Sequence, residues 1–234
     1  LTSPVGAAFA IHVTPNAPTG FVAMRPGPLM ASADEFTVTV KGRGTHASMP
    51  HFGIDPMPAA AEVVGALSTM VTRRIEAFDP AIVTVAHLTG GSTHNVIPER
   101  VLMEGTVRCV SAHTRDRVET LFAEVVHGVA SAHGCTAEID YTRGYPVTVN
   151  NAEMTELVGD VCEQVLGPDR MFPLPSPVMG AEDYSYILER VPGAMAFLGV
   201  CPADIENFLE APACHSDVMR LNEDALPLGA AMHA

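Results

Sequence analysis

Apolar residues alternate with acidic and hydroxyl residues over residues 35–42, and this period of two predicts a half-buried strand. Over residues 56–75 apolar side chains recur at helical spacing, which predicts an amphipathic helix. Between these elements lies a Gly-rich, Pro-interrupted segment, residues 41–55, that carries His46 and His51. A polar loop held between two regular elements is typical of a segment that presents chemistry.

The same patterns continue along the chain in the order βαββαβ. Strands are expected at about residues 35–42, 81–89, 101–111 and 136–143, and helices at about residues 56–75 and 114–133. This order matches the ferredoxin-like split βαβ unit, in which two helices pack on one face of an antiparallel four-stranded sheet. We therefore expect a small βαββαβ domain over residues 34–147.

The sequence on either side of this unit predicts a second layer of helices and strands. Apolar strands are expected at about residues 6–13, 21–25 and 194–200, a break at residues 26–28, and helices at about residues 153–166, 183–190 and 222–233. We predict an α/β fold in which residues 1–33 and 148–234 form one α/β domain, and the βαββαβ unit is inserted into it.

Composition and charge exclude several classes of protein. The formal net charge is −14, from 13 Lys and Arg against 27 Asp and Glu, so nucleic acids and anionic membranes are not expected partners. No apolar run approaches the ~20 residues that would span a bilayer. The five cysteines show no CxxC spacing and predict reduced thiols in a cytoplasmic protein. The chain opens at Leu1 into strand-like sequence, without an initiator Met or a signal-like segment, so we expect a preceding segment.

Two histidines and a glutamate are candidates for a metal site. His12 and His215 fall at the ends of predicted strands or in the adjoining loops, where a neutral imidazole can bind a divalent cation. For each histidine alone, a hydrogen-bonded structural role is the favoured alternative. Glu182, in the sequence MGAEDYS, could supply a ligand or support one, although acidic residues also favour helix N-termini.

His46 in the central loop is interpreted as a hydrogen-bond donor to a substrate oxyanion, and a metal-binding pair with His51 is the alternative.

Arg108 lies in the apolar strand GTVRCV, where an inward-facing arginine would need an anionic partner such as a substrate carboxylate. A structural salt bridge from Arg108 to Glu99 or Glu104 is the alternative.

Asn95 is the second candidate for holding substrate, in the loop STHNVIPER, where turn chemistry is the alternative. The sequence has no GxSxG, GxGxxG or P-loop motif, so serine hydrolases, dinucleotide-binding proteins and NTPases have no motif support.

Several of these segments together resemble one known family. The stretch from Gly6 to Pro56, GGSTHNVIPERVLMEGTVR, MGAEDYS and the late CHS are similar, in this order, to the aminoacylase, hippurate hydrolase and auxin-conjugate amidohydrolase family of dinuclear-metal, carboxypeptidase-like enzymes. The resemblance implies a metal-bearing α/β catalytic domain interrupted by a βαββαβ lid that also mediates homodimerisation. It further implies two divalent metal ions, for which Zn, Mn, Co and Ni are all suited to histidine and carboxylate ligands.

The resemblance also implies a role for each candidate residue. His12 and His215 match histidines that bind the two metals, and His46 matches the lid histidine that reaches the partner subunit's active site. Asn95 and Arg108 match lid residues that hold the substrate, and Glu182 is given a supporting role, with Tyr184 where the family usually has Phe. The implied reaction is metal-assisted hydrolysis of N-acyl amino acids or related amide conjugates.

These 234 residues lack the family's upstream metal ligands and its paired glutamates. We therefore interpret the chain as the C-terminal portion of such an enzyme, inactive alone and prone to self-association through an uncovered sheet. The alternative is a non-catalytic, dimerising or anion-binding remnant of the family.

Overall fold

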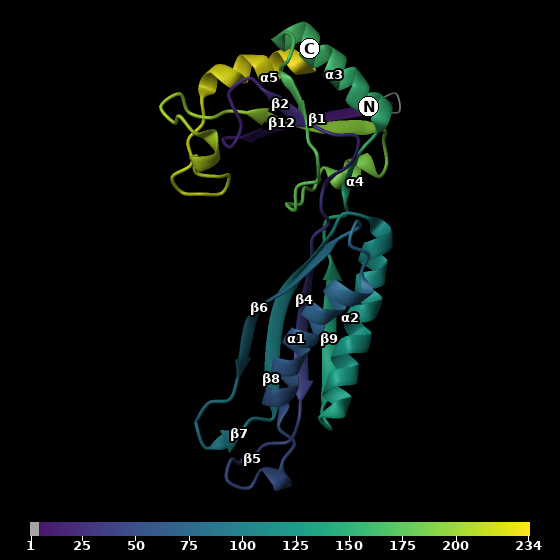
Figure 1. Ribbon diagram of the computed structural model, residues 1–234, viewed down its shortest axis with the longest axis vertical. Coiled ribbons are helices and arrows are strands. Elements are labelled where there is room, and N and C mark those ends of the chain that lie inside the picture. Colours follow the sequence, from purple (N-terminus) through teal and green to yellow (C-terminus); the bar gives the residue numbers. More distant parts are fainter. Residues whose placement is uncertain (1–4) are drawn as a thin grey trace. The chain divides into compact units, whose positions relative to one another are not determined.

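A computed structural model describes residues 5–234 (Figure 1). Contacts divide the chain into two compact units. Unit 1 takes in the described part of Leu1–Met30 together with Thr148–Val178 and Glu182–Ala234, and unit 2 takes in Ala31–Val147 and Met179–Ala181. None of the helices in the described chain is both long and apolar enough to cross a bilayer.

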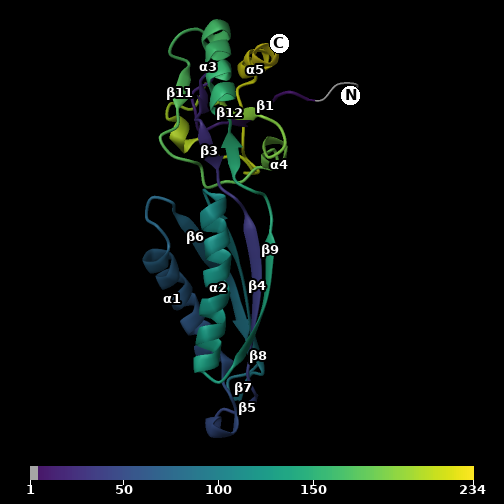
Figure 2. The same ribbon diagram turned by 90° about the vertical axis from the view of Figure 1, so that its right-hand side faces the viewer.

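Unit 2 is a four-stranded antiparallel sheet covered on one face by two helices, as Figures 1 and 2 show. The strands are β4 (Asp34–Lys41), β6 (Ala81–Gly90), β8 (Arg100–Cys109) and β9 (Thr136–Arg143), in the order β6-β8-β4-β9, and the helices are α1 (Pro56–Arg74) and α2 (Ala112–Ala132). These elements follow one another as βαββαβ, so the predicted order is confirmed, with each boundary within two residues of the predicted one.

The two helices begin at side-chain caps and bury one stripe each. Asp55 accepts a hydrogen bond from the backbone N–H of Met57 at the start of α1, and Ser111 accepts one from that of Thr114 at the start of α2. Buried apolar residues at helical spacing then face the sheet, where they meet every second residue of β4 and β8. This core includes Phe36, Val38, Val40, Val63, Leu67, Met103, Val107, Leu121 and Phe122.

A buried ion pair fastens one end of the unit 2 sheet to α2. Asp34, which is 1% exposed, accepts hydrogen bonds from Arg115, from the Tyr141 hydroxyl at 3.0 Å and from the Gly144 backbone N–H at 3.2 Å. Arg115 also donates to the Gly144 carbonyl oxygen at 3.0 Å. Because every partner is satisfied, this pair fixes the first residue of β4 against α2 and the end of β9.

The loop between β4 and α1 forms a small ribbon with the loop that precedes β8. Strand β5 (Thr45–His46) pairs antiparallel with β7 (Val96–Ile97), and a 3₁₀ turn, η1 (Pro50–Phe52), follows β5. Strands of two residues carry no hydrophobic period, so the sequence pattern does not reveal them.

Unit 1 is built on a second four-stranded sheet, in the order β1-β12-β2-β11. Its strands are β1 (Ala8–Thr14), β2 (Val22–Met24), β11 (Met171–Pro173) and β12 (Gly193–Gly199), with β1 and β12 parallel. Helices α3 (Ala152–Leu166) and α5 (Leu226–His233) pack on one face, and short elements complete the unit: α4 (Ser185–Leu188), η2 (Phe208–Glu210) and η3 (Glu223–Ala225). The predicted α/β fold class is confirmed.

One predicted break is in fact a strand. Strand β3 (Gly27–Met30) pairs antiparallel with β10 (Thr148–Asn150) in a two-stranded sheet. Gly27 has a φ of 74°, a conformation that glycine adopts freely, and this turn lets the chain re-enter an extended path directly after Pro26. The prediction of a break at residues 26–28 is therefore wrong beyond Pro26.

Candidate functional site

His12 lies on the face of the unit 1 sheet opposite α3 and α5. Its neighbours Ile11 and Val13 contribute to the core beneath the helices, so alternation along β1 turns His12 to the other face, where its ring meets Phe197 at a centroid distance of 5.9 Å. His12 Nδ1 lies 2.7 Å from the Val13 carbonyl oxygen. Because a carbonyl oxygen only accepts, Nδ1 carries the proton, and Nε2 of the neutral ring keeps a free lone pair.

Glu182 is brought to the same face. Its Oε2 atom lies 4.0 Å from His12 Nε2, and the two side chains are 23% and 34% exposed, so a ligand can reach both. This distance is too long for a hydrogen bond. Tyr184 and Phe197 pack against the same small apolar core, and the buried hydroxyl of Tyr184 has no hydrogen-bond partner among residues 5–234. Burial raises the pKa of this hydroxyl, so it stays neutral.

A loop carrying His215 is anchored beside His12. The thiol of Cys214 lies 3.4 Å from the Val13 carbonyl oxygen, the same atom that receives the His12 Nδ1–H. His215 follows with a φ of 73°, the left-handed conformation, and its side chain is exposed. Such a backbone conformation costs a non-glycine residue about 1 kcal/mol or more and is found at functional sites more often than elsewhere.

The metal-binding capacity of these residues alone is limited. In the part of the chain that the structure describes, no group of three or more His, Cys, Asp and Glu side chains is arranged to hold a metal ion. The donor chemistry of His12 nevertheless fits a metal ligand, because its second nitrogen is fixed on a backbone carbonyl.

His46 lies on the β5–β7 ribbon of unit 2, exposed to solvent. Its Nδ1 atom is 3.2 Å from the backbone N–H of Ser48 and 2.7 Å from the Ser48 hydroxyl. Since a backbone N–H only donates, Nδ1 is the acceptor, and Nε2 carries the proton of the neutral ring. His46 therefore presents an N–H donor, while its neighbour His51 stacks on Phe52 at a centroid distance of 4.2 Å.

Asn95 is held next to His46 by the same ribbon. The backbone carbonyl of Asn95 accepts the Ala47 N–H at 2.9 Å, and its side-chain Oδ1 accepts the Thr93 hydroxyl at 3.2 Å. Within residues 5–234 the amide N–H groups of Asn95 make no hydrogen bond, and the residue is exposed.

Arg108 lies on a different face of its strand from the one predicted. Val107 and Cys109 are buried under the helices, so the half-buried Arg108 lies on the opposite face of the sheet, and the prediction that it faces inward is wrong. It makes no ion pair within residues 5–234, and Glu104 is instead 2.7 Å from His87. Nor does the structure bring Arg108 to Asn95. Arg108 lies eight residues along β8 from Arg100, about 26 Å at ~3.3 Å per residue, whereas Asn95 is bonded to Ala47, beyond the end of β4 at which Lys41 pairs with Arg100.

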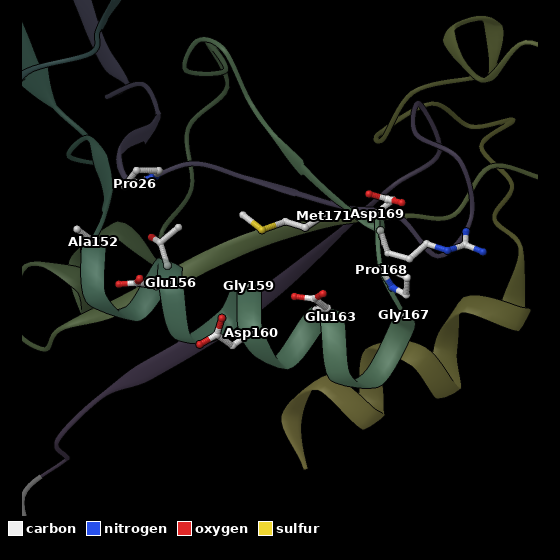
Figure 3. A pocket seen from close by; sticks show the side chains of 12 residues that line it. Pro26, Ala152, Glu156, Gly159, Asp160, Glu163, Gly167, Pro168, Asp169 and Met171 are labelled. Carbon is white, nitrogen blue, oxygen red and sulfur yellow. The ribbon is translucent and has the colours of Figure 1, made fainter.

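A cavity of about 560 Å³ runs along α3 in unit 1 (Figure 3). Carboxylates of Glu156, Asp160 and Glu163 are spaced along the helix, and Met171 lies against Gly159. None of the predicted site residues lines it.

Sequence reasoning missed two contributors to the candidate sites. The sequence identifies Cys214 only as a free thiol, although in the structure it anchors the His215 loop. Ser48 had no assigned role, although it fixes the His46 ring. A hydroxyl residue two positions after a loop histidine was the available signal for Ser48, whereas nothing local predicts the contact between Cys214 and Val13.

Comparison with known proteins gives a consistent result. The sequence model of peptidase family M20/M25/M40 matches residues 2–234. The chain is 37% identical over 199 residues to the N-acetyl-L-cysteine deacetylase of Bacillus subtilis, covering 83% of this chain and 46% of that protein. It is 36% identical over 234 residues to the IAA-amino acid hydrolase ILR1-like 2 of Arabidopsis thaliana, covering 98% of this chain and 52% of that protein.

Two solved structures share the fold over nearly the whole chain. One is a putative aminohydrolase from methicillin-resistant Staphylococcus aureus, with a TM-score of 0.87 and 28% identity over 97% of this chain and 57% of that one. The other is a dinuclear metal binding peptidase of the M20 family from Bacillus subtilis, with a TM-score of 0.80 and 25% identity over 98% of this chain and 55% of that one. The chain thus spans about half the length of the relatives that it matches.

Proposed function

The chain belongs to peptidase family M20/M25/M40, and we propose that it is the C-terminal portion of a metal-dependent amidohydrolase that cleaves N-acyl amino acids or related amide conjugates. The observation that carries this proposal is the state of His12. Its Nδ1–H is bonded to a carbonyl oxygen of its own strand, so Nε2, which lies 4.0 Å from Glu182 Oε2, is the nitrogen that would bind a metal. The named relatives are a deacetylase and an amino acid conjugate hydrolase, which supports amide bonds as the substrate class.

His12 and His215 would each bind one of two divalent metals, Zn, Mn, Co or Ni, with further donors supplied from outside residues 5–234, since no set of three is present there. Bound metal would supply an activated water that attacks the amide carbonyl. The left-handed backbone at His215 supports a functional role, because the loop holds a strained conformation for that side chain. Glu182 would support His12 by its negative charge.

His46 and Asn95 would act on the substrate. The Nε2–H of His46 would donate to the carbonyl oxygen as negative charge develops there, and the free amide N–H groups of Asn95 would hold the substrate beside it. Arg108 would bind a substrate carboxylate, supported by its half-buried position without an ion pair within residues 5–234.

We propose that unit 2 is the lid and mediates a homodimer. Strand β6 is an edge strand of ten residues, and its large apolar side chains Ile82 and Leu88 are 43% and 41% exposed. Such an edge is suited to pairing with a second copy. A homodimer would allow His46 of one subunit to serve the active site of the other.

We place the protein in the cytoplasm, because its five cysteines are free thiols, four of them buried. Solutes of that compartment, small N-acyl amino acids and amide conjugates, would then be the substrates.

The experiment that tests this function is hydrolysis of a panel of N-acyl amino acids by an N-terminally extended chain. We expect turnover to fall by at least about a hundredfold in His12→Gln, while His113→Gln, an exposed histidine at the start of α2, keeps the activity of the parent. Absence of hydrolysis in the extended parent would favour the non-catalytic alternative, a dimerising or anion-binding protein.

A further inference from the structure

A cavity of about 710 Å³ lies on the face of the unit 2 sheet that α1 and α2 leave uncovered. Thr39 and Leu102, which are cross-strand partners on β4 and β8, form its floor, and the Gly90-Gly91 turn after β6 forms one wall. Arg100 and Glu99 lie at its other side, and we call it the Arg100 cavity. Its volume suits a residue-sized group of a substrate.

The Arg100 cavity opens beside His46. Val96 lines the cavity, and Val96 is the direct cross-strand partner of His46 on the β5–β7 ribbon. Side chains of directly paired residues project from the same face of a ribbon, so the His46 side chain lies on the face from which Val96 meets the cavity. Both residues are exposed, whereas their neighbour Ile97 is buried, as this alternation requires.

The charged groups of the cavity have no partners of their own. Arg100 and Glu99 are exposed, and neither side chain forms an ion pair or hydrogen bond within the described residues 5–234. The neighbouring cation Lys41, opposite Arg100 on β4, is already paired with Glu138. One free guanidinium and one free carboxylate at the same cavity suit a ligand that carries both charges.

The two charges decide which part of the substrate can bind in the cavity. Val96 and Arg100 are four residues apart, so their Cα atoms are separated by at most about 13 Å, and one extended substrate can reach both positions. The nitrogen of the scissile amide is acylated and neutral, so it cannot be the ammonium group that Glu99 would bind. An amino acid end that carries both charges is therefore separate from the scissile amide.

We propose that the Arg100 cavity binds the free α-amino acid end of a substrate acylated on a remote amine, with Arg100 taking the carboxylate and Glu99 the ammonium group. The inference rests on the proposed function only for the placing of the scissile amide at His46. Hydroxyl groups of Thr39, Thr89 and Ser92 line the same cavity and supply further hydrogen bonds to such a polar group. Chains that carry neutral residues at positions 99 and 100 would lack this preference.

The test measures the binding of three small amides to the 234-residue chain. Binding is monitored by changes in the NMR shifts of the backbone amides. Nε-acetyl-lysine carries both charges, 6-acetamidohexanoate carries only the carboxylate, and N-(5-aminopentyl)acetamide carries only the ammonium group. We expect Nε-acetyl-lysine to bind at least about fivefold more tightly than either singly charged amide, with the largest shifts at Gly90, Gly91 and Val96. No metal and no turnover are needed, so this result is independent of whether the extended chain hydrolyses amides.

Variants of the charged residues complete the test. Arg100→Gln is expected to remove the advantage of Nε-acetyl-lysine over N-(5-aminopentyl)acetamide, and Glu99→Gln its advantage over 6-acetamidohexanoate. Lys41→Gln is the matched control, since it removes one positive charge from the neighbouring strand but does not line the cavity. Equal binding of all three amides, no binding, shifts elsewhere on the chain, or an Arg100→Gln variant that behaves like Lys41→Gln would overturn the proposal.

Discussion

The Nε2 atom of His12 lies 4.0 Å from the Oε2 atom of Glu182. The two residues come from distant segments, and the parallel pairing of β1 with β12 brings the segment before β12 alongside β1. His12 is held by a hydrogen bond of its other ring nitrogen, so its free nitrogen and the carboxylate approach without bonding to each other. A cation between the two atoms could bind to both the free nitrogen and the carboxylate.

Mixing of two inactive variants tests whether His46 acts across a dimer. In an extended chain we expect His12→Gln and His46→Gln each to be nearly inactive, and a reassociated mixture to regain about 25% of parent activity, because half of the dimers are mixed and each holds one intact site. Hydrolysis of an N-acyl amino acid is the readout. A mixture of His12→Gln with His215→Gln is the control and should stay inactive; recovery there, or none in the first mixture, would contradict action across the dimer.

Replacing His215 by glycine is expected to stabilise the fold and weaken metal binding. Glycine adopts the left-handed conformation of residue 215 without strain, so the free energy of unfolding should rise by about 1 kcal/mol in urea titrations. Asp169→Gly is the matched control, since Asp169 has a φ of 61° and lies outside the proposed metal site. Similar metal affinity in both variants would show that His215 has no role as a ligand.

Removal of one partner of the buried ion pair of unit 2 is expected to destabilise that unit strongly. Asp34→Asn leaves Arg115 buried without its counter-charge, so we expect the free energy of unfolding to fall by about 3–5 kcal/mol. Asp116→Asn, which alters an exposed pair with Arg143 at 2.7 Å, should cost no more than about 1 kcal/mol. Equal losses in urea unfolding would mean that burial does not set the difference.

The raised pKa of the Cys109 thiol allows a prediction of how the free energy of unfolding changes in alkaline solution. Burial, with a smaller contribution from Asp34, raises the pKa of the Cys109 thiol from 9.0 to about 12. The unfolded chain therefore loses this proton first, and the stability that the neutral thiol contributes is present below pH 9 and lost as pH rises toward 12.

Urea unfolding in a reducing buffer at pH 7.5 and at pH 10.5 checks this expectation. The wild-type chain should lose about 2 kcal/mol more between the two pH values than Cys109→Ala does, because about 1.5 pKa units separate pH 10.5 from the unfolded value. The comparison uses the change with pH, so the cost of the substitution itself cancels. Parallel losses in the two proteins would refute the assignment to Cys109.

The sequence predicted the regular elements of unit 2 well for a physical reason. Its long strands and helices each bury one face, and β4 at Asp34–Lys41 lies one residue from its predicted span. The short strands β5 and β7 were not predicted, because two residues cannot show a period. The ribbon that holds His46 next to Asn95 therefore appears only in the structure.

The sequence identified the candidate site residues by their residue types, but it did not predict which side chains and which face of the sheet surround them. Arg108 was expected to face inward because its neighbours are apolar, yet those neighbours belong to the opposite, buried face of β8. Likewise, the proximity of His12 to Glu182 and to the Cys214 loop depends on contacts between distant segments, and no local pattern encodes these.

Metal content is the most direct test of the central claim, that this chain holds part of a dinuclear amidohydrolase site. Metal per subunit would be measured after dialysis, for the 234-residue chain and for the N-terminally extended chain. We expect about two metals per subunit in the extended chain, a loss of metal in its His12→Gln variant, and little metal in the short chain. Two tightly bound metals in the short chain, or an extended chain that binds none, would contradict this account.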